Sequence, residues 1–386
     1  MLKRLVVLFL LMYSCSSEEE STLPPEPVKY TLTTAVNTKE GGTITPSSGE
    51  YNEGKTVDIT ATPSAKYDFS DWSGATGSSN KITIVMNSNK IVTANFTEKI
   101  PFYLDDNGVT IKAYDWVTTG ITGELNGVTY TAVDNTTLQS MIDDNKDITK
   151  VVTTLVNTFS FSGKNDFNQD ISSWDVSNVT NMQEVFDGAK SFNQDIGNWD
   201  VSNVTNFEKM FRDAYRFNQN IGGWDVSSAT NMNDFFNGAT DFNQPIGNWD
   251  VSNVTKMNGV FYSATSFNQD IGNWNVSSVT DMGSMFMNNR DNVKNTSFNQ
   301  DIGEWNVSNV TDMNNMFNAS DAFNQDIGNW DVSNVTNMNR MFMDAEAFNQ
   351  NLTKWCVTNI TDEPYAFSES SALTESNKPI WGTCPD

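Results

Sequence analysis

Carboxylate side chains recur at a fixed spacing through the second half of the chain. One series holds Asp175, Asp200, Asp225, Asp250, Asn275, Asn306 and Asp331, and ends at Cys356. A second series lies five residues earlier and holds Asp170, Asp195, Asp270, Asp301 and Asp326. Like charges stacked at a strand spacing of about 4.8 Å repel by roughly 1 kcal/mol per neighbouring pair even in water, so something should offset the repulsion.

Three interpretations of these carboxylates stand side by side. A divalent cation such as Ca²⁺ would bridge neighbouring carboxylates, because hard cations take several oxygen ligands; the chain has no D-x-D-x-D-G loop to support a dedicated calcium site. A basic partner would dock on the strip through complementary charge. Local hydrogen bonds among Asp, Ser and Asn, or to water, would leave a solvated face with no ligand. No confident metal site and no other cofactor is predicted.

Composition removes several classes of function. The chain has no histidine, which excludes Ser-His-Asp, Cys-His and histidine-ligated metal chemistry. Its 23 basic and 48 acidic residues give a net charge of −25, so nucleic acid is not an expected partner. Catalysis by Asp pairs also requires a cleft and a raised pKa, which a regular row of open carboxylates does not offer. We therefore expect a binding protein and no enzyme; a carbohydrate-capturing or Asp-dependent glycan-acting protein is the alternative.

Tryptophan sets the period that positions these carboxylates. Eight tryptophans stand in register, with gaps of 25, 25, 25, 25, 31, 25 and 25 residues: Trp174, Trp199, Trp224, Trp249, Trp274, Trp305, Trp330 and Trp355. A period between 20 and 50 residues is typical of a solenoid, in which each repeat contacts only its neighbours. The register of Trp with Val predicts that the eight rings are core. The six extra residues of the long gap, around 289–294, are predicted to be a loop that either binds or has drifted.

Within one copy the pattern predicts a strand and then a short helix. Trp199 and Val201 are two residues apart and would share one face of a strand that stacks in parallel on its neighbours. Thr205 and Glu208 form a capping-box spacing, as do Thr180 and Gln183. After them, apolar residues recur at i, i+3 and i+4, as in Phe207, Met210 and Phe211. The sequence therefore predicts an α/β solenoid. The Phe-Asn-Gln segment should be structural, with its amides satisfying backbone groups at a turn.

The repeated phrase resembles a known family of surface-protein repeats. The order Ile196, Trp199, Val201, Val204 is similar to the leucine-rich-repeat skeleton with Trp and Val substituted. Over about 165–360, F-N-Q-D-I-x-x-W-D-V-S-N-V-T-N-M-x-x-M-F resembles the DUF285, or BspA-like leucine-rich, repeats, and 103–112 resembles the segment that precedes them. The resemblance implies a right-handed leucine-rich-repeat-type solenoid of eight repeats. It also implies bacterial surface adhesion through a protein or matrix ligand.

The ends of the repeat region should be capped. Residues 100–160 are predicted as an N-terminal cap, 161–360 as the repeats and 361–386 as a C-terminal cap. Cys356 and Cys384 are predicted to form a disulfide, since outside the cytoplasm such a pair is most simply bonded. It would clip the tail over the open end of the stack.

Residues 29–98 have a different texture. Four segments are rich in β-branched residues and predict strands: 29–36, 56–62, 82–86 and 91–96. The motifs G-G-T-I-T-P-S-S-G-E-Y-N-E-G and Y-D-F-S-D-W-S-G resemble the divergent InlB B-repeat family. The resemblance implies a small β-rich, β-grasp-like spacer module. Trp72 and Phe69 could bind sugar, but we expect them in its core.

The N-terminal sequence predicts the location of the protein in the cell. Residues 1–14 read as a signal peptide, with Lys3 and Arg4 before an apolar run too short to span a bilayer. Cys15 follows and resembles the lipidated cysteine of bacterial lipoproteins; an ordinary cleaved signal with an unmodified cysteine is the alternative. Residues 15–28 are acidic and Pro-rich and predict a tether. We expect a lipid-anchored protein at the outer membrane and cell surface, touching the membrane only through its lipid, with a periplasmic scaffold as the alternative.

Overall fold

The structure is a computed structural model, and it describes residues 25–288 and 297–385. The predicted signal peptide, Cys15 and most of the tether lie outside the described residues, as do the extra residues around 289–294. The chain divides into two compact units, Met1–Lys99 and Ile100–Asp386, which are described separately. Within the described ranges, no helix is long and apolar enough to cross a membrane.

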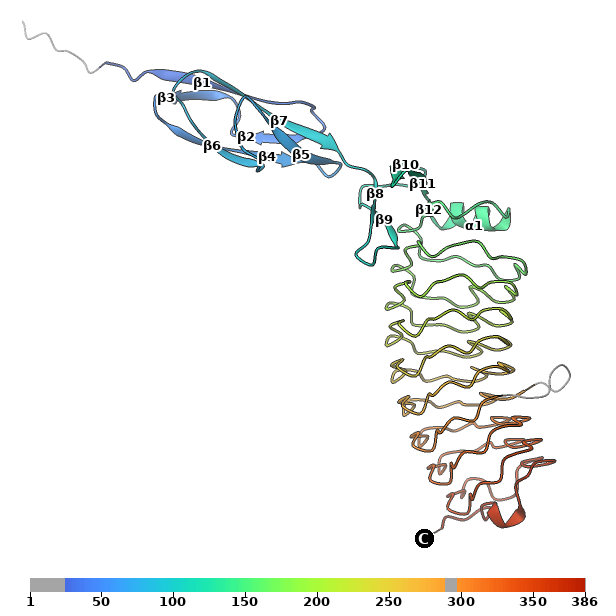
Figure 1. Ribbon diagram of the computed structural model, residues 1–386. Coiled ribbons are helices and arrows are strands. Elements are labelled where there is room, and N and C mark those ends of the chain that lie inside the picture. The colour runs from blue at the N-terminus through green and yellow to red at the C-terminus, as the bar shows by residue number, and fades with distance from the viewer. Residues whose placement is uncertain (1–24, 289–296, 386) are drawn as a thin grey trace, which may run out of the picture. The chain divides into compact units, whose positions relative to one another are not determined.

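The first unit is built from strands in two sheets (Figure 1). Its strands are β1 (Lys29–Val36), β2 (Gly42–Thr45), β3 (Gly49–Asn52), β4 (Thr56–Pro63), β5 (Tyr67–Ser73), β6 (Lys81–Val85) and β7 (Lys90–Glu98). One sheet has the order β3-β1-β7-β5, with β1 and β7 parallel; the other has the order β2-β4-β6 and is antiparallel. All four predicted strands are present.

Residues from both sheets form the core of this unit. Val57 and Ile59 of β4 point into it, as do Val92 and Phe96 of β7, because alternate residues of a strand face one side. Trp72 is buried among them, and its indole N–H donates to the carbonyl of Ser79 at 2.8 Å. The expectation of a core tryptophan is confirmed. No helix crosses the sheets among the described residues of this unit, so only the parallel pairing of β1 with β7 fits the β-grasp-like expectation.

The second unit begins with short strands and one helix. These are β8 (Phe102–Leu104), β9 (Ile111–Ala113), β10 (Thr122–Leu125), β11 (Val128–Ala132), α1 (Asn135–Asp143) and β12 (Val151–Val152). The carboxylate of Asp134 accepts from the backbone N–H of Thr137 at 2.8 Å and so caps α1. Leu138 and Ile142 are the buried face of this helix. They join the same apolar core as the repeats that follow.

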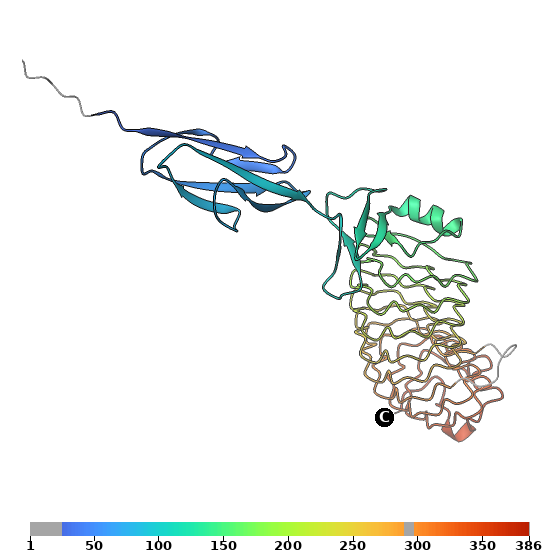
Figure 2. The same cartoon turned by 45° about the horizontal axis from the view of Figure 1, so that its top comes forward.

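From about residue 160 the chain winds into a series of stacked coils, one per tryptophan period, which we call the coil stack (Figures 1 and 2). Parallel bridges link equivalent residues of successive coils: Asn181, Asn206, Asn231, Lys256, Asp281, Asp312 and Asn337. On both sides of each bridge, backbone N–H groups donate to carbonyls of the adjacent coil. Phe207 donates to Asn231 and Lys209 to Asn233, for example, at 2.9 and 2.8 Å. Each coil is therefore tied to its neighbours by bonds between residues about 24 positions apart.

The predicted helices of the repeats are absent, and the α/β prediction is wrong: the described residues hold mainly strands and turns with one α-helix. Lys209 and Asp213 have φ values of 56° and 55°, in the left-handed region that an α-helix excludes. Alternate N–H groups serve different partners. Met210 donates to Phe207 within its own coil, while Phe211 donates to Phe235 of the next. A spacing of i, i+3 and i+4 thus fits a run of tight turns as well as a helix.

The capping boxes and the Trp-x-Val strand are also corrected. The hydroxyl of Thr205 donates to the carbonyl of Thr180 in the preceding coil at 3.3 Å, so it caps no helix. Glu208 accepts from Asn231 of the following coil at 3.0 Å. Trp199 and Val201 are both buried, yet they lie in a turn-rich segment with no strand. Pairing between coils occurs instead beyond the threonine, where the helix was predicted.

The core of the coil stack is aromatic. All eight in-register tryptophans are at most 4% exposed, which confirms them as core. Each indole N–H donates to an isoleucine carbonyl of an earlier coil, as Trp224 does to Ile196 at 3.0 Å. Phenylalanine rings stack between coils, with Phe211 and Phe236 at 5.7 Å, and within a coil, with Phe236 and Phe242 at 4.0 Å. Offset stacking of this kind adds to the stabilisation from burial.

The Phe-Asn-Gln segment is structural, as predicted. The side-chain oxygen of Asn193 accepts from the backbone N–H of Asn218 and from the side-chain amide of Gln219, both at 2.9 Å. The same pair of bonds recurs from Asn243 to Asn268 and Gln269. An asparagine ladder therefore satisfies the backbone at this corner of every coil it spans.

Candidate functional site

The first carboxylate series turns the chain. In Asp200 one oxygen accepts from both the backbone N–H and the hydroxyl of Ser202, at 3.1 and 2.6 Å. Asp225, Asp250 and Asp331 accept from the N–H of the serine two residues on at 3.0–3.1 Å. These are Asx turns, in which a side chain replaces a backbone partner. The local hydrogen-bonding interpretation is therefore what these residues display.

The second series forms the same kind of turn five residues earlier in the repeat. Asp170, Asp195, Asp270, Asp301 and Asp326 each accept from the N–H two residues on, at 2.9–3.0 Å. In four of these copies the donor is a glycine. At Gly197 an added Cβ would lie 2.6 Å from the carbonyl oxygen of Asn220 in the next coil, so only glycine fits this close approach.

Hydrogen bonding lowers the pKa of two carboxyls in the first series. The hydroxyl and the backbone N–H of Ser227 hold the pKa of Asp225 below its ordinary value. Ser252 does the same for the pKa of Asp250. Both bonds stabilise the charged form, so these groups are carboxylates at neutral pH. A general acid would require the opposite shift.

Asp175 departs from the prediction of an exposed row. It is only 3% exposed, because the N-terminal segment of this unit covers it. The N–H of Ile111 in β9 donates to the carbonyl of Ser173 at 2.9 Å, which brings Lys112 close enough for its charge to act on Asp175. The hydroxyl of Thr153 donates to the backbone carbonyl of Asp175 at 2.9 Å. Asp175 is thus part of the capped end, and it offers no surface to a ligand.

The remaining carboxylates form two exposed sets that we call the acidic rows. Their members are Asp200, Asp225, Asp250 and Asp331 in the first row, and Asp170, Asp195, Asp270, Asp301 and Asp326 in the second. Throughout the part of the chain that the structure describes, no ion pair joins any of these nine to a Lys or Arg. Basic residues of the stack pair elsewhere, as Arg212 does with Asp187. The rows therefore keep their negative charge uncompensated.

The described residues show no cluster of side chains that could bind a metal ion. Among residues 25–288 and 297–385, no group of three or more His, Cys, Asp or Glu side chains gathers where it could hold an ion. Each carboxylate of the rows already uses one oxygen in its own turn. The geometry thus favours a docking strip or a solvated face over a multidentate calcium site.

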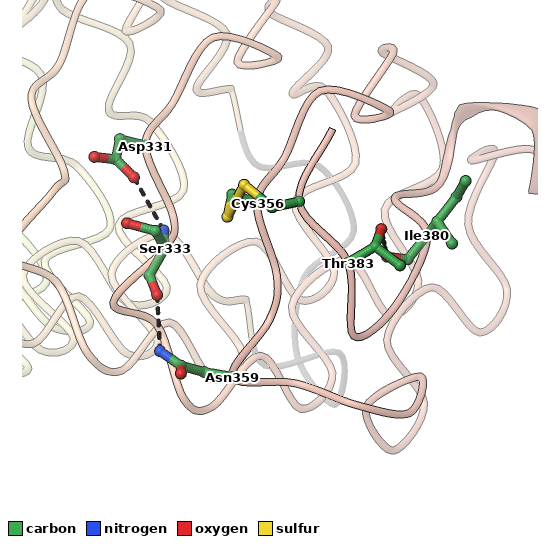
Figure 3. Close-up of a disulfide and its surroundings, with 7 residues drawn as sticks. Asp331, Ser333, Cys356, Asn359, Ile380 and Thr383 are labelled. Atoms are coloured by element: carbon green, nitrogen blue, oxygen red, sulfur yellow. Dashed lines mark hydrogen bonds between the residues drawn. A yellow bond between two sulfur atoms is a disulfide. The ribbon is translucent and has the colours of Figure 1, made fainter. Parts of the chain in front are cut away.

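The last row member lies beside the C-terminal cap (Figure 3). Asp331 accepts from Ser333 at 3.1 Å, and the carbonyl of Ser333 accepts from the side chain of Asn359 at 2.7 Å. Cys356, which takes the row position in the next coil, is bonded to Cys384 in a disulfide. The tail also pairs with that coil: Val357 donates to the carbonyl of Thr383 at 2.9 Å. The predicted cysteine pair is thus present and closes the end of the stack. The 3-10 helix η1 (Glu375–Asn377) precedes Cys384 in the chain.

The repeat pattern did not predict a groove in the side of the coil stack. It has a volume of about 620 Å³ and crosses four successive coils. Its lining includes Asp213, Tyr215, Arg216, Asp241 and Tyr262. These residues stand at positions where the copies of the repeat differ in sequence. Thr240 and Thr265, for example, occupy the repeat position of Tyr215, and such differences were the sequence feature that could have indicated the groove.

Comparison with family models decides the family. A model described as "Mycoplasma protein of unknown function, DUF285" matches residues 131–242, 219–295 and 292–381, which together span more than half of the 386 residues. The chain belongs to the DUF285 family. The DUF285 match takes in α1, β12 and the coil stack, including every member of the acidic rows.

The first unit of this DUF285 protein matches a second model. The divergent InlB B-repeat domain matches residues 32–100, which include the two sheets except for the first three residues of β1. Both resemblances expected from the sequence are confirmed. The comparisons with curated proteins and with solved structures found no match.

Proposed function

We propose that this DUF285 protein is a lipid-anchored surface protein that binds a basic protein or matrix ligand through its acidic rows and catalyses no reaction. Its coil stack would act as a solenoid that presents the rows, with the B-repeat unit as a spacer. A repeat family together with a B-repeat domain supports a surface-type interaction protein.

One observation carries the binding proposal: the carboxylates of the rows are exposed, fixed by Asx turns and uncompensated by any cation in the described part of the chain. Charges that are held in place by the fold lose little side-chain freedom when a partner binds. A basic partner would also be steered to the rows, because complementary charge raises the association rate. The net charge of −25 extends that attraction over the whole molecule.

The anchor is proposed from the sequence alone. An apolar run, then Cys15, then an acidic and Pro-rich stretch fits a lipidated cysteine with an extended tether. Two or more acyl chains attached to Cys15 would hold such a chain at a membrane without a spanning helix.

Neutralising the first row should weaken binding of a basic probe. The variant carries Asp200→Asn, Asp225→Asn, Asp250→Asn and Asp331→Asn, and the probe is immobilised poly-L-lysine, read by surface plasmon resonance. Asn keeps the Asx turn, as Asn275 and Asn306 show in the same row. We expect affinity to fall by about 10-fold or more at low salt, with a smaller salt dependence.

A matched control has the same net charge without touching the rows. It carries Glu40→Gln, Glu50→Gln, Glu53→Gln and Glu124→Gln, all at exposed positions. This control should lose less than about 2-fold in affinity. Equal loss in both variants would show that only overall charge attracts the probe, and the rows would no longer be the binding surface.

A further inference from the structure

The groove in the side of the coil stack lies apart from the acidic rows. We call it the side groove. Its lining comes from the turns that follow one buried phenylalanine in each of four coils, Phe211, Phe236, Phe261 and Phe286, while the rows flank the tryptophans. Its volume of about 620 Å³ falls within the range of about 300–1,000 Å³ that is usual for small-molecule sites.

Among the described residues around the side groove, charge is balanced, in contrast to the net charge of −25 of the whole chain. Arg216 pairs with Asp241, Nη1 to Oδ2, at 3.2 Å. Arg212 pairs with Asp187, and its Nε donates to Oδ1 at 2.8 Å. The Nζ of Lys190 lies 5.6 Å from the centre of the Tyr215 ring. A cationic ligand would gain more from the acidic rows, so this neutral groove favours an uncharged ligand.

Asp213 gives the groove a carboxylate acceptor. Its carboxylate has no side-chain hydrogen bond or ion pair within the described ranges, although its backbone N–H donates to Asn237 at 2.7 Å. Burial raises the pKa of Asp213, because the charged form is partly desolvated. A hydroxyl donor from a ligand would take the place of the solvent at this half-buried carboxylate.

Tyr215 supplies ring surface beside this acceptor. Tyr215 is 39% exposed, and Tyr262 lies partly buried two coils further along the groove. Between them the lining is small and polar, with Gly238, Thr240 and Ser263. A flat aromatic ring combined with fixed polar groups suits a ligand that has both C–H faces and hydroxyl donors.

We propose that the side groove binds a short neutral oligosaccharide. Sugar hydroxyls would donate to the carboxylate of Asp213 and contact the polar lining, and the C–H face of a ring would rest on Tyr215. Binding involves no covalent step. The inference does not rest on the acidic rows, because none of their residues lines the groove.

The repeats themselves provide conservative variants. Ala319 occupies the repeat position of Asp213 with a φ of 54°, so Asp213→Ala places a residue that this turn accepts elsewhere. Thr240 stands at the repeat position of Tyr215, so Tyr215→Thr is matched in the same way. Removing the Asp213 carboxylate should cost no electrostatic stability at neutral pH. A carboxyl whose pKa is raised on folding favours the folded state at low pH, and that contribution is lost as the pH rises through the folded pKa.

The test uses the full chain and saturation-transfer NMR with four probes: maltotriose, cellotriose, mannotriose and triacetylchitotriose. At least one should bind with a Kd below about 10 mM, and both variants should weaken it by about 10-fold or more. Asp200→Asn serves as the control and should bind as the wild type does, which separates this site from the rows. Thermal unfolding should show that Asp213→Ala and Tyr215→Thr are both folded at the temperature of the binding measurement. Absence of binding by all four probes, unchanged affinity in both variants, or equal competition by trilysine would each overturn the proposal.

Discussion

Replacing Phe236 by alanine should lower the free energy of unfolding by about 3–5 kcal/mol, the range for truncating a large buried aromatic side chain. Phe236 is fully buried. Its ring stacks on Phe211 and Phe261 of the two adjacent coils, at 5.7 and 5.8 Å, and on Phe242 at 4.0 Å. Its removal therefore weakens the contacts of one coil with both of its neighbours. In a stacked array that loss affects the whole stack, because each coil depends on its neighbours.

Urea unfolding, followed by tryptophan fluorescence, measures this loss. Asn248→Ser is the matched control: it lies in the next coil, is exposed, and has Ser173 at the same repeat position. The control should stay within about 0.5 kcal/mol of wild type. A cost below about 1 kcal/mol for Phe236→Ala would contradict a core built from stacked rings.

Removing the disulfide should be the next largest loss. The double variant Cys356→Ser, Cys384→Ser opens a loop with a sequence separation of 28, which chain-entropy models value at about 3–4 kcal/mol. The tail then remains on the last coil only through packing and a few backbone bonds. These include Leu352 to Asn377 at 2.8 Å and Gly382 to Ile360 at 2.9 Å.

Hydrogen exchange locates the effect of this double variant. Protection should fall first at Trp355–Ile360, which the tail covers, and least near Ile221 in the middle of the stack. Wild type treated with a reductant should behave as the double variant does. Equal stability of the oxidised, reduced and substituted proteins would mean that the end of the stack needs no covalent clip.

The sequence was most informative where side chains repeat. The tryptophan register predicted the stacked copies and their core, because a residue buried in one copy must be buried in all copies that stack alike. β-branched runs predicted β1, β4, β6 and β7. The Asn-Gln segment was read as a satisfied turn, and the asparagine ladder from Asn193 to Asn218 shows how.

The sequence was least informative where backbone hydrogen bonds between coils determine the local conformation. Phe207, Met210 and Phe211 fit a helical period, but Lys209 and Asp213 adopt left-handed φ values. The N–H groups of this segment bond to a coil about 24 residues away, and no local pattern reveals such a partner. Helix signals assume local bonds, so they fail in a fold whose pairing is between repeats.

The candidate sites divide in the same way. All nine carboxylates in the acidic rows have a serine or glycine two residues further on. This spacing allows Asx turns, and it left three interpretations open. The cover over Asp175 comes from β9, more than sixty residues earlier in the chain, so periodicity placed it on the surface. The side groove arises where copies depart from their consensus at Tyr215 and Tyr262, and a search for regularity overlooks departures.

Surface display of the coil stack is tested most directly by protease shaving of intact cells, with mass-spectrometric recovery of peptides and lipid labelling of wild type and Cys15→Ala. We predict that peptides from residues 161–360 are released from intact cells, and that the label is lost in the variant. A periplasmic marker protein should stay uncut in the same cells. Protection of the repeat peptides in intact cells, with release only after lysis, would place the stack inside the envelope and contradict a surface ligand.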